Sequence, residues 1–215
     1  MAPPVEIRAG VTLFRHGQIG TALYLIEEGL VLLTRAGAAN TTTSVLRGPS
    51  WLLGAASCVL GRPHPATAET LTDCRLRSIR ADACRRLQTD PTVGPWLHRM
   101  LAREWYEQVE TMSFIRDANA AQRLDRLLIM LVNQRGERCR DGTVRLNPHL
   151  TRAVIGQIVG VARESASRLL SNLQREGVIR CERVPWVFPK GSRLLAAMTD
   201  APYAPAARLI SIAAT

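Results

Sequence analysis

Long apolar runs and aromatic residues are both scarce in this sequence. Phe, Trp and Tyr make up 5% of the 215 residues, and no run approaches the roughly 18–20 apolar residues that a membrane-spanning helix requires. The opening segment, MAPPVEIRAG, lacks the basic stretch followed by apolar residues that an export signal has. These absences predict a cytoplasmic protein with no membrane partner.

Cysteine is present, but in no arrangement that forms a site. The five cysteines are an odd number without CxxC or Cys/His ligand spacing, which argues against a disulfide framework and a structural zinc site. The sequence also contains no HExxH, P-loop or GxSxG motif, and its four histidines have no triad-like setting. We therefore expect reduced thiols, no metal site, no catalytic residues and no enzymatic activity.

Lysine is almost absent, whereas arginine is abundant. Lys190 is the single lysine among 28 basic residues, and the formal net charge is +10. Residues 135–215 contain 13 basic and 6 acidic residues, against 15 and 12 in residues 1–134. Arginine offers paired planar donors that suit phosphate groups and guanine edges. The distribution therefore indicates a polyanionic partner that binds the C-terminal part of the chain.

Short apolar runs separated by turn residues fill the N-terminal part. Between residues 5 and 81 the runs include TLF, ALYLI, LVLL and SVL, with glycines such as Gly29 and Gly48 between them. Runs of this length with closely spaced turn residues are typical of a small antiparallel barrel or jelly roll. We expect residues 1–90 to form such a barrel in an α+β protein.

The pattern changes to helical spacing after Pro91. Apolar residues recur every three or four positions from Trp96 to Met112, which predicts a long amphipathic helix in residues 91–117. A second helix is predicted in residues 120–134, with residues 117–119 as the hinge. The apolar stripe of the long helix has two interpretations, packing on its own domain or pairing with a second copy. We favour a homodimer, because so long a helix exposes more apolar surface than a small barrel covers.

Residues 150–179 contain two short helical patterns that meet at Gly160. Two helices joined by a tight glycine turn describe a helix-turn-helix, although an ordinary helical corner has the same pattern. The first turns of the second helix carry polar side chains that are able to read base edges in the major groove: Arg163, Glu164, Ser167 and Arg168. These residues predict that 118–215 is a DNA-binding domain.

The stretch that follows, residues 180–188, is predicted to form two short strands about a turn. Such a hairpin would be the wing of a winged helix-turn-helix. We expect Arg180, Arg183 and Lys190 to face DNA phosphates from this part of the chain.

The segment IGQIVGVARESASRLLSNLQREGVI, residues 155–179, resembles the DNA-binding segment of the Crp/Fnr family of bacterial transcription regulators. Upstream, LFRHG at 13–17, LYLI at 23–26 and glycines 48 and 54 are similar to the family's cyclic-nucleotide-binding-type barrel. The predicted long helix lies where the family has its dimerisation helix. The resemblance implies a homodimer that binds double-stranded DNA at a palindrome with half-sites related to TGTGA or TTGAT. RNA polymerase is a further candidate partner.

The resemblance also implies roles for single residues. Glu164, Ser167 and Arg168 match the family's base-reading E-x-x-S-R pattern, and Arg163 matches an arginine of the cyclic-AMP-responsive branch. The positions that contact phosphates in the family are occupied here by Thr151, Arg152 and Gln157. Ala162 departs from the pattern, because a serine that caps the recognition helix often stands there.

The effector does not follow from the resemblance. In the cyclic-nucleotide branch a Gly-Glu pair binds the ribose and an Arg-Ser/Thr pair binds the cyclic phosphate, whereas this chain has Gly54-Ala55 and Pro65-Ala66. Because the carboxylate and the guanidinium are missing, nothing offsets the burial of a cyclic phosphate, and cyclic AMP is not expected to bind. The iron-sulfur branch has N-terminal cysteines, and the first cysteine here is Cys58.

Several modes of control stay open. Cys58 resembles the position of a haem-ligating cysteine in the carbon-monoxide-sensing branch, with His64 nearby, so haem is a candidate cofactor for a pocket that includes Gly54, Ala55 and Ala66. Cys181 is a candidate redox sensor, as an exposed thiol whose oxidation would disturb DNA binding. The plainer alternatives are two structural cysteines, a lipid-like ligand, action without a ligand, and a binding module that acts through protein partners without DNA.

Overall fold

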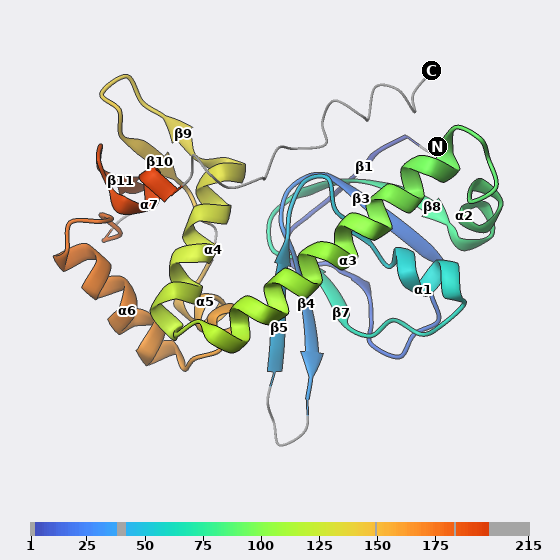
Figure 1. The fold of residues 1–215 in the computed structure, drawn as a ribbon, viewed down its shortest axis with the longest axis horizontal. Coiled ribbons are helices and arrows are strands. Elements are labelled where there is room, and N and C mark those ends of the chain that lie inside the picture. The colour runs from blue at the N-terminus through green and yellow to red at the C-terminus, as the bar shows by residue number, and fades with distance from the viewer. Residues whose placement is uncertain (1–2, 38–41, 149, 183, 198–215) are drawn as a thin grey trace. The chain divides into compact units, whose positions relative to one another are not determined.

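The computed structural model describes residues 3–37, 42–148, 150–182 and 184–197. The chain divides into two compact units, the first ending at Phe114 and the second beginning at Ile115. The first unit is built mainly from strands and the second mainly from helices (Figure 1). The predicted α+β class is therefore confirmed.

The first unit contains two four-stranded antiparallel sheets. The strands of one sheet are, in order across it, β1 (Val5–Ile7), β8 (Cys74–Arg80), β3 (Ala22–Glu28) and β6 (Leu52–Leu53). Those of the other are β2 (Thr12–Phe14), β7 (Thr67–Thr70), β4 (Val31–Ala36) and β5 (Thr42–Arg47). Ile26, Val31 and Leu76 are buried in one cluster that joins strands of both sheets. This is the antiparallel barrel that the short apolar runs predict.

Two short helices in this unit were not predicted from the sequence. They are α1 (Ala55–Leu60) and α2 (Ala81–Leu87). Both pack on β3 and contribute Cys58 and Cys84 to a second buried cluster. They are six and seven residues long, which is too short for a helical period to stand out from the surrounding strand pattern.

The predicted long helix is α3 (Val93–Asp117). Asp90 caps its start, because its Oδ1 accepts hydrogen bonds from the backbone N–H groups of Thr92 and Val93 at 2.8 and 2.9 Å. Leu97 and Met100 near its start join the buried cluster of α1, α2 and β3. Among the described residues, no helix is long and apolar enough to cross a membrane.

The main helix of the second unit is α4 (Ala120–Arg135), and it begins at a complete capping box between Asn119 and Gln122. Four leucines form its buried face, as the sequence predicts: Leu124, Leu127, Leu128 and Leu131. The other helices are α5 (Arg152–Val159), α6 (Arg163–Arg175) and α7 (Arg193–Ala196). A three-stranded antiparallel sheet runs in the order β11 (Trp186–Phe188), β10 (Val144–Leu146), β9 (Glu137–Arg138).

The predicted wing is only partly correct. The described residues of 180–188 contain one strand, β11, which pairs with β10, and a single bridge from Arg180 to Val187. Trp186 and Phe188 are buried where they pair with β10, so the apolar pattern of this stretch serves the sheet. Pro185 has no N–H to donate, which disfavours a longer strand on its N-terminal side.

Candidate nucleic-acid interface

The turn between α5 and α6 is fixed by glycines. Gly160 ends α5 with a φ of 77°, a left-handed conformation that glycine adopts without strain. The N–H of Val161 then donates to the carbonyl of Gly156 at 2.8 Å. A Cβ on Gly156 would lie 2.7 Å from the Val161 oxygen, so the backbone of the turn approaches α5 too closely there for any side chain. The predicted helix-turn-helix is present.

The two sides of α6 differ sharply. Ala166, Leu170 and Leu173 are buried and hold the helix on the unit. On the opposite side, the side chains predicted to read bases occupy the first two turns: Arg163, Glu164 and Arg168 are exposed, and Ser167 is half-buried. These four lie at positions i, i+1, i+4 and i+5, which project from neighbouring parts of one face. The structure therefore brings all four together on an outward surface.

Two local features of this surface are a hydrogen bond of Arg168 and an N-terminus of α6 without a side-chain cap. Nη2 of Arg168 donates to Oγ of Ser165 at 3.0 Å, which holds the guanidinium along the outward face. Ala162 precedes the helix with extended backbone and supplies no side-chain cap, as expected from the sequence. The amide groups of the first turn are oriented toward whatever approaches this end, and such groups favour anions.

The residues predicted to contact phosphates are arranged less uniformly. Oγ1 of the exposed Thr151 accepts from the Val154 N–H at 3.2 Å and so caps α5. Arg152 packs inward, with its guanidinium 5.5 Å from the centre of the Trp186 ring and Nη2 3.5 Å from the Cys181 carbonyl oxygen. Gln157 is half-buried on α5.

The remaining phosphate candidates lie apart from these. Arg180 is exposed beside its bridge to Val187, and Arg183 lies outside the described residues. Lys190 is next to Gly142 of the β9–β10 turn, in a pocket that begins beyond the C-terminal end of α6. A helix of 13 residues is about 20 Å long. Lys190 is therefore at the end of α6 opposite to Arg163.

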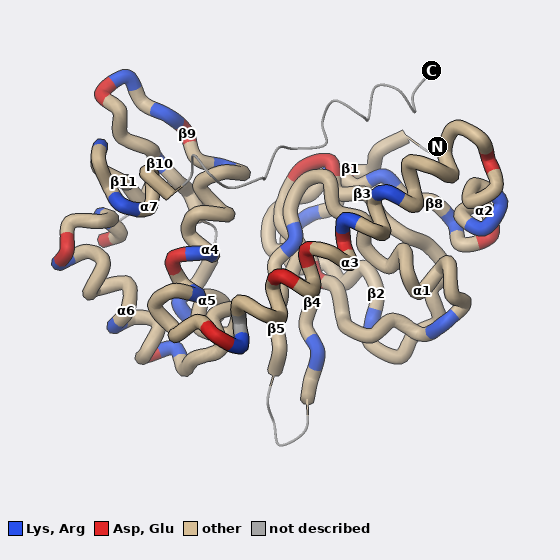
Figure 2. Tube along the Cα trace, in the orientation of Figure 1, with Lys and Arg blue, Asp and Glu red and all other residues tan. Residues whose placement is uncertain are grey.

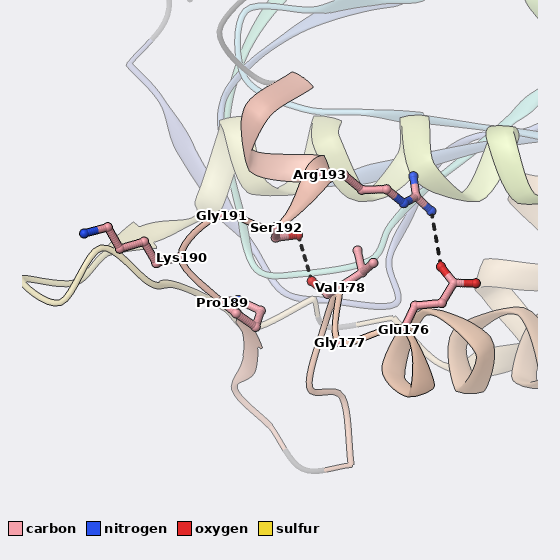
Figure 3. A pocket seen from close by; sticks show the side chains of 8 residues that line it. All are labelled: Glu176, Gly177, Val178, Pro189, Lys190, Gly191, Ser192 and Arg193. Atoms are coloured by element: carbon pink, nitrogen blue, oxygen red, sulfur yellow. Dashed lines mark hydrogen bonds and ion pairs between the residues drawn. The ribbon is translucent and has the colours of Figure 1, made fainter.

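Figure 3 shows this pocket of about 380 Å³. Two of its lining residues make contacts between elements: Oγ of Ser192 donates to the Val178 carbonyl at 2.8 Å, and Arg193 forms ion pairs with Glu176 and with Asp125 of α4. Lys190 points away from the other labelled side chains. These contacts hold the segment around α7 against α4 and the end of α6, so the residues around the pocket have a structural role.

Basic residues are present in several elements of the second unit. They lie on the β9–β10 hairpin, on α5 and along α6 (Figure 2), and the excess of basic over acidic residues in the sequence is greatest in this part of the chain. An arginine-rich surface around an outward-facing helix is the electrostatic arrangement that a DNA backbone requires.

The expectation of an exposed redox thiol at Cys181 is wrong. Its side chain is 4% exposed, and its Sγ lies 3.4 Å from Oε1 of Gln174. Arg152 approaches it from α5. A buried thiol is shielded from oxidants, so the structure supports the alternative of a structural cysteine.

Some residues of the candidate effector pocket lie together in the barrel: Gly54 is next to His64, and Ala55 and Cys58 share one buried cluster. Gly54 precedes α1, and Ala55 and Cys58 are buried on that helix, while Ala66 is half-buried just before β7. His64 is 2% exposed, and its ring stacks on Phe14 with 3.8 Å between ring centres. A Cβ on Gly54 would be 2.8 Å from Cε1 of His64. The imidazole therefore fills the space that a side chain at residue 54 would need.

These residues do not fit a haem as they are held. Burial raises the pKa of the Cys58 thiol to about 11, whereas the thiolate is the form that binds a metal. Burial lowers the pKa of His64, which keeps the ring neutral, but the ring is packed between Phe14 and Gly54. Both side chains serve the barrel core, which is the plainer of the two interpretations of Cys58.

Sequence reasoning missed two polar side chains that connect elements. Glu104 of α3 accepts a hydrogen bond from the Leu52 N–H of the edge strand β6 at 3.0 Å. Burial raises the pKa of its carboxyl to about 7, although the Leu52 hydrogen bond and the charge of Arg47 act to lower it. Arg123 of α4 contacts two backbone carbonyls in the second unit. The only sequence signal for Glu104 is an acidic residue between apolar positions, which an exposed helix face also has.

Two family models match the chain, the cyclic nucleotide-binding domain over residues 4–90 and the Crp-like helix-turn-helix domain over residues 122–196. A CRP-like cAMP-activated global transcriptional regulator of Mycobacterium tuberculosis is 31% identical over 195 residues, which are 89% of this chain and 86% of that protein. The chain belongs to the Crp/Fnr family of bacterial transcription regulators. This family regulates transcription and is not a family of enzymes, and α5 and α6 are its DNA-binding helix-turn-helix.

Other Crp/Fnr proteins resemble the chain at greater distance. The cyclic AMP receptor protein of Thermus thermophilus is 29% identical over 176 residues, which are 80% of this chain and 76% of that protein. The structure of FixK2 from Bradyrhizobium japonicum superimposes with a TM-score of 0.74 at 20% identity, covering 95% of this chain and all of that one. The second likeness supports the fold alone.

Proposed function

We propose that this Crp/Fnr protein is a cytoplasmic homodimer that binds a palindromic DNA site and reads its bases with α6. The observation that carries the proposal is the gathering of Arg163, Glu164, Ser167 and Arg168 on the outward face of the first two turns, while the apolar face of the same helix is buried. In this assignment residues 1–90 are the sensory barrel, 91–117 the dimerisation helix and 118–215 the DNA-binding domain.

Each side chain suits a particular edge in the major groove. Arginine donates twice to O6 and N7 of guanine, and glutamate accepts from N4 of cytosine. Arg163 and Arg168 are therefore the guanine readers and Glu164 the cytosine reader, with Ser167 as an adaptable contact. Thr151, Arg152, Gln157, Arg180, Arg183 and Lys190 are the phosphate candidates; of these, Arg152 would have to leave Trp186 to reach a phosphate.

The exposed part of α3 supports the proposed dimer. Trp105, Tyr106, Val109 and Met112 are 72, 64, 44 and 70% exposed. A second copy that pairs through this stripe would remove it from water. Two-fold symmetry then requires two half-sites about 34 Å apart, which is one turn of DNA. RNA polymerase is the partner we propose for the DNA-bound dimer.

We propose that the effector is not cyclic AMP, although the names of two relatives mention that nucleotide. Ala55 has a methyl group where the family's cyclic-nucleotide branch has a carboxylate, and Pro65-Ala66 supplies no guanidinium. A buried cyclic phosphate without such partners is strongly disfavoured. Control by a ligand of lower charge, or by the amount of protein, agrees better with these residues.

Selection of bound sequences from random DNA tests the proposal, with wild type compared with Arg168→Ala and with Arg175→Ala. Both variants lose one positive charge from an exposed position on α6, but Arg175 is at the far end. Arg168→Ala should lose preference at one base pair of each half-site and weaken binding to the selected site about ten- to hundredfold. Arg175→Ala should weaken selected and random DNA to the same extent.

Three results would contradict the proposal. Equal weakening of selected and random DNA by Arg168→Ala would remove its base-reading role. Binding that is absent, or that does not fall as salt is raised, would favour a module that acts through protein partners, because neutralising phosphates makes affinity strongly salt-dependent. A tighter complex when cyclic AMP is added to the same selection would restore that nucleotide as the effector.

A further inference from the structure

Arg123 connects two places in the second unit that are far apart in the sequence. Its Nε donates to the carbonyl of Val159 at 2.8 Å, and its Nη1 donates to the carbonyl of Ala118 at 2.7 Å. The side chain is partly buried at both contacts. Charge-assisted hydrogen bonds of this length in a partly buried place are stronger than those of an exposed ion pair.

Both acceptors are at positions that matter for orientation. Val159 is the last residue of α5, where carbonyl groups have no partner within the helix and a positive charge is favoured. Gly160 then turns the chain toward α6, which begins at Arg163. Ala118 is the first residue after α3. One guanidinium therefore joins the residue between α3 and α4 to the end of α5, next to the turn that leads into α6.

The backbone around Arg123 is itself held by hydrogen bonds at the start of α4. Asn119 and Gln122 form the reciprocal capping box at the start of α4, with bonds of 3.0 and 2.8 Å, and the Arg123 N–H donates to the Asn119 carbonyl at 3.0 Å. Arginine suits the task because its planar fork binds two acceptors at once in fixed geometry, whereas the lysine ammonium is a single flexible point charge.

We propose that Arg123 is a positioning residue for DNA recognition: it holds the hinge after α3 at a fixed distance from the helix-turn-helix turn. The first turns of α6 are then presented in one orientation relative to Ala118 and the start of α4. This role rests on the proposed reading of a palindrome by a dimer. Its consequence is that Arg123 determines how strictly the protein requires one spacing between the two half-sites.

The experiment measures affinity for the selected palindrome, for the same palindrome with one base pair added to or removed from its centre, and for a duplex with a single half-site. Wild type is compared with Arg123→Gln, Arg123→Lys and the control Arg126→Gln, which removes the same charge from an exposed position on α4. We expect wild type and Arg126→Gln to lose about tenfold or more when the spacing changes.

Arg123→Gln should reduce this spacing penalty to about threefold or less, while its affinity for the single half-site stays within about twofold of that of Arg126→Gln. Arg123→Lys should lie between, because it reaches one carbonyl at a time. A spacing penalty equal to that of wild type would overturn the proposal. So would an equal loss on all DNA sites together with a lowered melting temperature, because that is the effect of a merely structural residue.

Hydrogen exchange of the DNA-free protein gives a readout that does not depend on the proposed function. The Val161 N–H, which bonds to Gly156, lies within the turn that Arg123 holds. Its exchange should be about tenfold faster in Arg123→Gln than in Arg126→Gln. If wild type selects no palindrome, the proposed function fails, and faster exchange at Val161 still supports the connection whereas unchanged exchange overturns it.

Discussion

Ala162 occupies the N-cap position of α6 without the side chain that usually serves there. Its backbone is extended, with φ −62° and ψ 154°, and its side chain is exposed. A serine fits the same backbone and would accept a hydrogen bond from the first turn. The present residue leaves the first amide groups of α6 available to a phosphate, at a cost in the stability of the unbound protein.

Replacing this residue should therefore stabilise the protein. Ala162→Ser is expected to raise the free energy of unfolding by about 1 kcal/mol, which is a rise of a few degrees in the melting temperature of the second unit. The matched control is Ala153→Ser, an exposed change inside α5, where serine is a poorer helix former than alanine. Thermal unfolding followed by circular dichroism makes the comparison, and a melting temperature at or below that of wild type would refute the prediction.

Single residues also show the limit of sequence reasoning. The missing cap at Ala162 could be predicted, because capping depends on residues next to each other in the chain. The burial of Cys181 could not, because it depends on Arg152 of α5 and Gln174 of α6. The contact of Arg123 with the Val159 carbonyl could not be predicted either, since Val159 is 36 residues away from it.

At the level of elements, Glu104 links α3 to the sheet edge. Strand β6 lies at the edge of its sheet, next to β3, and the Glu104 carboxylate accepts a hydrogen bond from the Leu52 N–H of that strand. Strand β6 leads directly into Gly54 and α1, where the candidate effector residues lie. The contact therefore ties the helix that we propose to dimerise to the segment that we propose to sense a ligand.

This carboxyl should make the stability of the first unit depend on pH. Burial raises its folded pKa to about 7 from an ordinary 4.5, with the charge of Glu107 acting in the same direction and the Leu52 N–H and Arg47 opposing it. The folded protein therefore holds the proton more tightly than the unfolded chain. The associated stability is fully present below the unfolded pKa and is lost as pH rises through the folded pKa of about 7.

Glu104→Gln should remove this dependence, because the amide oxygen still accepts from Leu52 and carries no charge. Urea unfolding between about pH 5 and about pH 8 should show wild type losing stability that the variant keeps. Glu6→Gln is the control, since it makes the same chemical change at an exposed position on β1 of the same unit. A wild type and a Glu104→Gln variant with parallel pH profiles would show that Glu104 does not titrate in this range.

Elements were predictable in proportion to their length and local signals. Helices α3 and α4 have long apolar periods and clear caps, and α5 and α6 have a glycine turn between them. The helices of four to seven residues, α1, α2 and α7, have no such period. Of the two predicted wing strands, the second is present as β11, but it pairs with β10, some 40 residues earlier in the chain, which the local pattern does not reveal.

At the scale of the whole molecule, the proposed function depends on symmetry. One α6 reads a few base pairs, which is too little for a selective site, and a second copy doubles the contacts and adds a spacing requirement. The sequence predicts the apolar stripe of α3 that would join two copies, and in the structure the first part of that stripe is used internally, at Leu97 and Met100. The exposed remainder, from Trp105 to Met112, is the part left for a partner.

A charged side chain in the exposed part of α3, from Trp105 to Met112, should therefore disrupt the proposed dimer. Met112→Glu places a carboxylate in a position that is 70% exposed in the single chain and buried in the proposed dimer, where an unpaired charge is strongly disfavoured. Leu60→Glu makes the same chemical change at a side chain that is 67% exposed on α1. Wild type and Leu60→Glu should have twice the 23.7 kDa mass of the chain in light scattering, and Met112→Glu the single mass. Because the substitution leaves α6 unchanged, Met112→Glu should still bind DNA, but it should bind a palindrome no more tightly than a single half-site. A wild-type mass of 23.7 kDa, or a Met112→Glu variant that stays dimeric, would contradict pairing through this part of α3.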